Sequence, residues 1–166
     1  MPSFLIKVTF GRWQTDPSWL PAGDLQAAAL FDLRFSNNKL SMWKIDDTHS
    51  NLDRVITALA VNNGKLSIEK VDYVLLSPEL TQSLGIKIEK SSGGTLDRLA
   101  NSEWHHDIIE LSVSQIVAIA NCIKGLTIHR KAERDVLKLL KEGLEKKHID
   151  ITRADKELRP KLEALM

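Results

Sequence analysis

Residues 3–10 alternate with a period of two between an apolar face and a face that carries Leu5, Lys7 and Thr9. The side chains that share one face of this segment are all apolar: Phe4, Ile6, Val8 and Phe10. Because successive side chains of a β-strand point to opposite faces, a period of two predicts a half-buried strand.

A β-hairpin is the second unit that the pattern predicts. Residues 30–35 and 39–45 both alternate, and Asn37-Asn38 lies between them. Asparagine tolerates the positive φ that tight hairpin turns require, so this pair marks the turn.

Later segments have apolar residues every three or four positions, the period of an amphipathic helix. Residues 52–59 and 131–147 show it clearly. Ser112 and Gln115 form a capping box at the start of a further helix over residues 113–124. That segment is apolar almost all round, which predicts a helix buried on several sides at the centre of the core.

Strands and helices are mixed without regular alternation. Residues 71–76 and 107–111 are further predicted strands, while residues 126–130 fit either a strand or the turn of a helix-turn-helix motif. This order predicts an α+β fold, in which helices cover one face of a mainly antiparallel sheet formed by the N-terminal strand and the hairpin. We expect a single domain over residues 1–166, leaving open a separate C-terminal helical lobe at 131–166.

The composition narrows the class of protein. The 166 residues include 23 basic and 22 acidic side chains, for a formal charge of +1, and 43% of them are hydrophobic. These values are typical of a globular protein and argue against a surface built throughout for nucleic acid. No apolar run reaches the roughly 18 residues that cross a bilayer. With Cys122 as the only cysteine, no internal disulfide can form, so we expect a cytoplasmic protein that does not contact membranes.

The common catalytic and cofactor-binding signatures are absent from the sequence. It contains no P-loop, no G-x-G-x-x-G and no G-x-S-x-G, so we expect no cofactor, and an enzyme is not the favoured interpretation. The densest group of potential metal ligands is His105, His106 and Asp107. Adjacent histidines diverge in a strand or a helix, so one at most would reach a given ion. A metal-dependent hydrolase centred on these residues is therefore the weakest hypothesis.

A basic stripe follows the predicted helix at 131–147. Its members are Lys131, Arg134, Lys138 and Lys141. Such a stripe can follow a phosphate backbone, which makes a nucleic-acid-binding module the second hypothesis. The pairs Lys138–Glu142 and Lys141–Glu145 have i, i+4 spacing and partly neutralise the stripe, as on an ordinary solvated helix.

The positions of three tryptophans lead to the first hypothesis about function, a protein-binding surface. Arg12, Trp13 and Trp19 lie in a long irregular segment after the first strand, and Trp43 lies on the less apolar side of the predicted hairpin. Such a segment is either packed against its own domain or offered to a partner, and tryptophan is enriched in binding surfaces. We favour an exposed surface made by these four residues. The corresponding function is that of a small accessory, regulatory or inhibitor protein that binds another protein or a second copy of itself.

Overall fold

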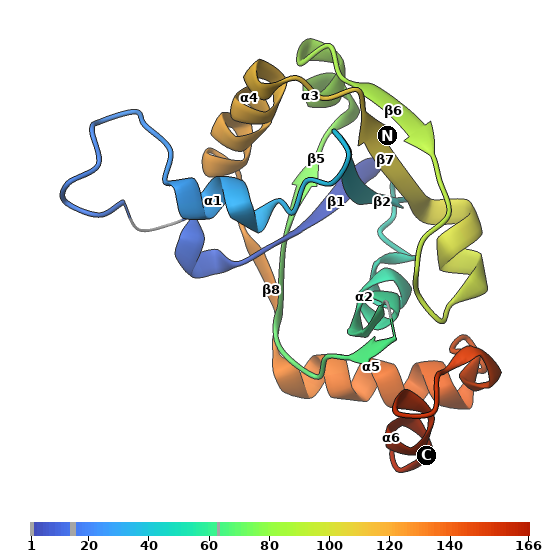
Figure 1. The fold of residues 1–166 in the computed structure, drawn as a ribbon. Helices are drawn as coiled ribbons and strands as arrows, with labels where there is room; N and C mark the ends of the chain where they lie inside the picture. Colours follow the sequence, from blue (N-terminus) through green and yellow to red (C-terminus); the bar gives the residue numbers. More distant parts are fainter. Residues whose placement is uncertain (1, 14–15, 63) are drawn as a thin grey trace.

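The fold is known from a computed structural model that describes residues 2–13, 16–62 and 64–166 (Figure 1). Its centre is a six-stranded sheet with the strand order β6-β7-β2-β1-β5-β8, in which every neighbouring pair is antiparallel. The strands of this sheet are β1 (Ser3–Val8), β2 (Leu40–Ile45), β5 (Val71–Leu76), β6 (Lys87–Lys90), β7 (His105–Ile109) and β8 (His129–Lys131). A two-stranded sheet pairs β3 (Val61–Asn62) with β4 (Lys65–Leu66).

Helices connect and cover these strands. The α-helices are α1 (Ala27–Asp32), α2 (Leu52–Ala60), α3 (Pro78–Ser83), α4 (Val113–Lys124), α5 (Glu133–Glu145) and α6 (Leu158–Glu163). Three shorter segments are η1 (Phe10–Arg12), the π-helical η2 (Ala100–Trp104) and η3 (Ile151–Arg153). Helices combined with a mainly antiparallel sheet confirm the predicted α+β class. No helix within residues 2–13, 16–62 and 64–166 is both long and apolar enough to span a membrane.

Both faces of the sheet are covered, not one face as the sequence predicted. Leu5 and Ile6 are neighbours in β1, and both are buried, but they belong to different apolar clusters. Ile6 packs in a cluster with residues of α1 and α4, whereas Leu5 packs in a cluster with residues of α2 and α5. A strand inside the sheet must therefore be apolar on both sides, which explains why alternation in β1 is incomplete.

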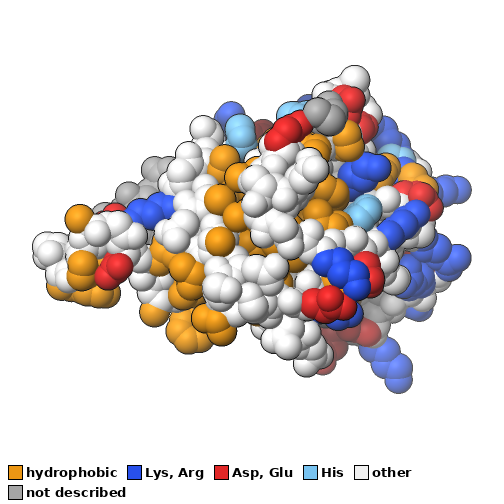
Figure 2. Space-filling model, turned by 90° about the horizontal axis from the view of Figure 1, so that it is seen from above, with side chains coloured by type: hydrophobic (Ala, Val, Ile, Leu, Met, Phe, Trp, Pro, Cys, Tyr) orange, Lys and Arg blue, Asp and Glu red, His pale blue; other side chains and the backbone are white. Residues whose placement is uncertain are grey.

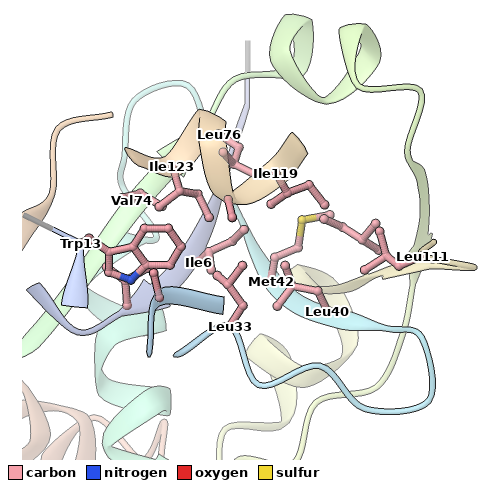
Figure 3. Packing of buried hydrophobic residues seen from close by; sticks show 14 residues of the cluster. Ile6, Trp13, Leu33, Leu40, Met42, Val74, Leu76, Leu111, Ile119 and Ile123 are labelled. Atoms are coloured by element: carbon pink, nitrogen blue, oxygen red, sulfur yellow. The ribbon is translucent and has the colours of Figure 1, made fainter. Parts of the chain in front are cut away.

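The first cluster joins the sheet to α4 (Figure 3). Ile119 and Ile123 point from α4 onto Val74 and Leu76 of β5, and Trp13 closes one end of the cluster. Ser112 caps α4 through the predicted capping box with Gln115. Only one side of α4 is buried, however, so the prediction of a helix enclosed on several sides was wrong.

The predicted hairpin is wrong in its first arm. Asn37 and Asn38 do form a turn with positive φ, at 52° and 57°. The segment before them, however, is the helix α1, and β2 pairs instead with β1 and with the distant β7. Residues 27–29 are three alanines, the strongest helix formers, and they favour a helix over the extended arm.

The C-terminal third begins with a strand. Because β8 pairs with β5, residues 129–131 are not the turn of a helix-turn-helix motif. Val136 of α5 lies in the same cluster as α2, while Leu140 and Leu144 lie in a third cluster with Leu158 and Leu162 of α6. Helix α5 therefore contributes to both clusters. The separate lobe at 131–166 stays a prediction.

Candidate protein-interaction surface

The tryptophan cluster expected from the sequence is not an exposed surface. The side chains of Trp13 and Trp43 are only 5% and 4% exposed, whereas Trp19 is 73% exposed. Trp43 packs edge-on against His105 at 4.8 Å between ring centroids. Arg12 lies 3.4 Å from the carboxylate of Asp32. The assumption that these rings are exposed is therefore wrong for Trp13 and Trp43, and holds for Trp19.

Trp13 is held inside by a carboxylate from α1. Its indole Nε1–H donates to Oδ2 of Asp32 across 2.8 Å, and Asp32 is only 5% exposed. The backbone N–H and the hydroxyl of Thr9 also donate to this carboxylate, at 2.5 and 2.7 Å. Asp32 is thus satisfied by donors from the segment after β1, and it fixes that segment on α1.

An exposed apolar face lies instead on α1 and α4. Phe31 and Val113 are 79% and 77% exposed, and Val117 is 37% exposed. The two helices are in contact, and Val113, Ile116 and Val117 share one side of α4 because they are three and four residues apart. In Figure 2, apolar side chains gather on the half of the molecule that carries α1 and α4, while most charged side chains lie at the other end.

A groove of about 330 Å³ runs between the two helices. It is lined by Ala27, Leu30, Phe31, Arg34, Phe35 and Ile116. We call this groove, together with Val113 and Val117, the α1–α4 surface. Large exposed apolar patches are uncommon on monomeric proteins and are typical of binding sites.

The two helices of the α1–α4 surface carry no exposed acidic side chain. Helix α4 contains no acidic residue, and Asp32, the acidic residue of α1, is buried toward the core. The guanidinium of Arg34 has no ion-pair partner among the described residues. An arginine at the rim of an apolar groove can therefore form a bidentate pair with a carboxylate from outside the chain.

The sequence has a helical pattern of apolar residues that indicates this surface, but residues 30–35 also alternate and were therefore interpreted as a strand. Residues 27, 30, 31, 34 and 35 follow the i, i+3, i+4, i+7, i+8 spacing of one helix face, and all but Arg34 are apolar. The opposite side of the same segment carries Ala29, Asp32 and Leu33, which are buried. The segment is thus apolar on two sides. Its inner side is buried, whereas on its outer side Leu30 and Phe35 pack only partly against the core and Phe31 is exposed.

The structure brings three members of the basic stripe together. Arg134, Lys138 and Lys141 line one shallow groove on α5, with Glu142 and Glu145 beside them. Lys131 instead forms an ion pair with Asp53 at 2.7 Å. Lys138 lies 3.9 Å from Glu142, as predicted, whereas the expected pair between Lys141 and Glu145 is not found within 4 Å. Nucleic-acid binding stays a prediction, since the three cations remain mixed with acids.

The two histidines of the predicted metal cluster lie on opposite faces of β7. His105 contacts the Trp43 ring, whereas the ring of His106 lies 5.5 Å from that of Phe4 in the other cluster. Asp107 accepts a hydrogen bond from the hydroxyl of Ser41 at 2.9 Å. Burial lowers the pKa of His105 below its ordinary value. No group of three His, Cys, Asp or Glu side chains in the described part of the chain is arranged to hold a metal ion, so the metal-dependent hydrolase gains no support.

A polar groove of about 380 Å³ lies between α2 and α5, and one of the residues that line it, Arg54, forms a buried ion pair within the chain. The guanidinium of Arg54 binds the fully buried carboxylate of Asp97 through two bonds of 2.6 and 2.9 Å. It also lies 5.5 Å from the centre of the Trp104 ring. Burial and the charge of Arg54 lower the pKa of His148, which lines the same groove. Arg54 therefore ties η2 to α2.

Comparisons with known proteins add no relative. No family model matches the chain, and searches of curated proteins and of solved structures also find no match.

Proposed function

We propose that this protein is a small accessory, regulatory or inhibitor protein that binds another protein through the α1–α4 surface. The observation that carries the proposal is the 79% exposure of Phe31 beside an apolar groove. Exposure of an aromatic ring to water is unfavourable, and its burial against a partner contributes favourably to the free energy of binding.

The proposed occupant is a segment of another protein with an apolar anchor flanked by carboxylates. The apolar anchor fits the groove between Leu30, Phe31 and Ile116. The carboxylates suit Arg34, because Asp32, the acidic residue of α1, is buried and bound by Thr9 and Trp13, and α4 has no acidic residue. In a symmetric dimer the same patch faces itself, so two Arg34 side chains would meet without compensation. That repulsion disfavours a second copy as the occupant.

We retain the cytoplasm as the setting of this interaction, because the chain has Cys122 as its only cysteine and depends on no disulfide.

Two synthetic amphipathic helices test the proposal. They share one apolar face of leucine and phenylalanine, and they differ only in carrying glutamates or lysines beside it. Binding is measured by fluorescence anisotropy of the labelled peptides. We expect the glutamate peptide to bind saturably and the lysine peptide to bind more weakly. Phe31→Asp is expected to weaken binding of the glutamate peptide about tenfold or more.

Met166→Asp is the matched control, because it adds the same charge at an apolar residue that is 78% exposed at the other end of the molecule. The control is expected to leave binding unchanged. Absence of binding by either peptide, or an equal loss in both variants, contradicts the proposal. Sedimentation that shows a dimer dissociated by Phe31→Asp also contradicts it, since a second copy then occupies the groove.

A further inference from the structure

Strands β1 and β2 separate before either of them ends. They pair only at Ser3–Ile45, Phe4–Lys44 and Leu5–Trp43. Beyond Leu5, β1 continues to pair with β5 as far as Val8, and β2 continues to pair with β7 as far as Leu40. The hydrogen-bonded pairing of β1 and β2 is therefore interrupted beyond Leu5, and the two strands leave a space between them there.

The opening is a cavity of about 240 Å³. Apolar side chains, among them Leu33, Leu40, Trp43 and Leu59, form part of its wall. Polar residues complete it, and they are Lys7, Thr9, Asp32, Arg34, Ser41 and Asn62. A partly apolar cavity with a few convergent polar groups is the usual form of a small-molecule site.

Two cations border this cavity without a carboxylate partner. Neither Lys7 nor Arg34 forms an ion pair with any described residue. Burial lowers the pKa of Lys7 below its ordinary 10.5, and the positive charge of Arg34 lowers it further. Both side chains are exposed to solvent and their positive charges repel each other, so an anion between them would relieve this repulsion.

The nearest carboxylates do not fill this role. Asp32 and Asp72 attract the charge of Lys7, as does Glu69, but none of the three forms an ion pair with it. Asp32 accepts hydrogen bonds from Thr9, Trp13 and Arg12. Asp72 is bound by two bonds from Arg130 at 2.6 and 3.0 Å. Both buried carboxylates thus have their own donors, which leaves Lys7 available.

Arg34 occupies a backbone conformation that usually belongs to glycine. Its φ is +50°, directly after the end of α1. This conformation costs a residue with a Cβ about 1 kcal/mol relative to glycine. The backbone at this position therefore gives no reason for an arginine. From this position Arg34 lines the cavity, and its positive charge acts on Lys7 of β1.

We propose that the cavity between β1 and β2 binds a small molecule that carries a phosphate or carboxylate group. Lys7 and Arg34 bind the oxyanion, because an ammonium and a guanidinium together supply charge-assisted hydrogen bonds to its oxygens. The remainder of the ligand packs on Trp43 and Leu59. Arg34 also belongs to the α1–α4 surface, but Lys7 does not, so anion binding measured at Lys7 tests this site separately from that surface.

Titration of the wild-type protein with inorganic phosphate, and separately with acetate, tests the proposal at constant ionic strength with chloride as the balancing anion. Binding is followed by NMR through the indole signal of Trp43 and the side-chain Cε signal of Lys7. We expect saturation by at least one of the two anions, together with a rise in the pKa of Lys7. Saturation by phosphate alone identifies a phosphate ester as the ligand class, and saturation by acetate alone identifies a carboxylic acid.

Three variants separate this site from non-specific attraction to a basic surface. Lys7→Met keeps the aliphatic stem and removes the charge, and Arg34→Gly removes the guanidinium while suiting the positive φ. Each is expected to weaken anion binding about tenfold or more. Lys44→Met removes an exposed lysine of β2 outside the cavity and is expected to change nothing.

No saturation by either anion in the wild type overturns the proposal, and so does equal weakening by Lys44→Met and Lys7→Met. The wild-type titration of Lys7 decides the matter even where Lys7→Met does not fold, because a pKa of Lys7 that is insensitive to both anions contradicts the site.

Discussion

Phe31 and Asp32 are neighbours in α1, and each occupies the environment expected of the other. The phenyl ring is 79% exposed, whereas the carboxylate is 5% exposed and receives the indole N–H of Trp13. The inner side of α1 thus serves the fold through a satisfied acid, while its outer side carries an apolar ring that the fold does not use. This inversion is the strongest structural indication of a binding surface.

Removing the outer ring should leave the fold intact. We expect Phe31→Ser to change the free energy of unfolding by no more than about 0.5 kcal/mol, because an exposed side chain contributes little to it. Ile119→Ala on the buried side of α4 should cost about 2–5 kcal/mol. Urea denaturation followed by circular dichroism measures both. A large loss in Phe31→Ser would mean that the ring stabilises this chain and is not reserved for a partner.

The carboxylate on the inner side should matter far more. Asp32→Ala leaves the donors of Thr9 and Trp13 without an acceptor, so we expect a loss of about 2–4 kcal/mol and a red shift of tryptophan emission. Asp16→Ala is the matched control, since Asp16 forms a partly exposed ion pair with Lys124 at 2.9 Å. It should cost less than about 1 kcal/mol. Similar losses in the two variants would contradict the anchoring role of Asp32.

The ion pair between Arg54 and Asp97 should be another large contributor. Arg54→Met strands a carboxylate whose side chain is fully buried, so we expect a loss of about 3 kcal/mol in thermal or chemical unfolding. Arg98→Met breaks a pair with Asp150, in which the arginine side chain is 73% exposed, and should cost less than about 1 kcal/mol. An equally mild effect of Arg54→Met would contradict a large contribution of this ion pair to stability.

Stability should fall in mild acid because of His105. Burial lowers its pKa below 6.5 in the folded protein, so between the two values the unfolded chain binds a proton that the folded protein does not. Stability is therefore fully present above about pH 6.5 and decreases as the pH falls through this window. His105→Gln should flatten the dependence, and His148→Gln should flatten it further, since burial also lowers the pKa of His148. Unchanged pH dependence in the double variant would contradict this assignment.

Local features of the fold could be predicted from the sequence where neighbouring residues determine them. Ser112 and Gln115 form the expected cap, and Asn37 and Asn38 adopt the expected positive φ. The prediction of a strand before the Asn37-Asn38 turn was wrong, because contacts far apart in the sequence decide which strands pair. Strand β7, more than 60 residues from β2, pairs with β2 in place of that predicted strand. Alternation in residues 30–35 carries no information about that competitor.

The sequence led to a protein interface as a hypothesis, which stays a prediction, and it placed that interface on residues that are in part buried. The absence of catalytic signatures led to a protein interface, yet the residues chosen for it included two buried tryptophans. The burial of Trp13 depends on a carboxylate 19 positions away, and nothing in the sequence near Trp13 marks this contact. The diverging strands around Lys7 could not be foreseen either, because a gap in a sheet has no sequence period.

A methyl NMR titration with the glutamate peptide tests whether the α1–α4 surface recognises an acidic amphipathic segment. We expect the largest shifts at the methyl groups of Leu30, Val113, Ile116 and Val117, and we expect these shifts to vanish in Phe31→Asp. Shifts confined to methyl groups elsewhere, such as Leu137 beside the basic stripe, or an absence of shifts at saturating peptide, would contradict it.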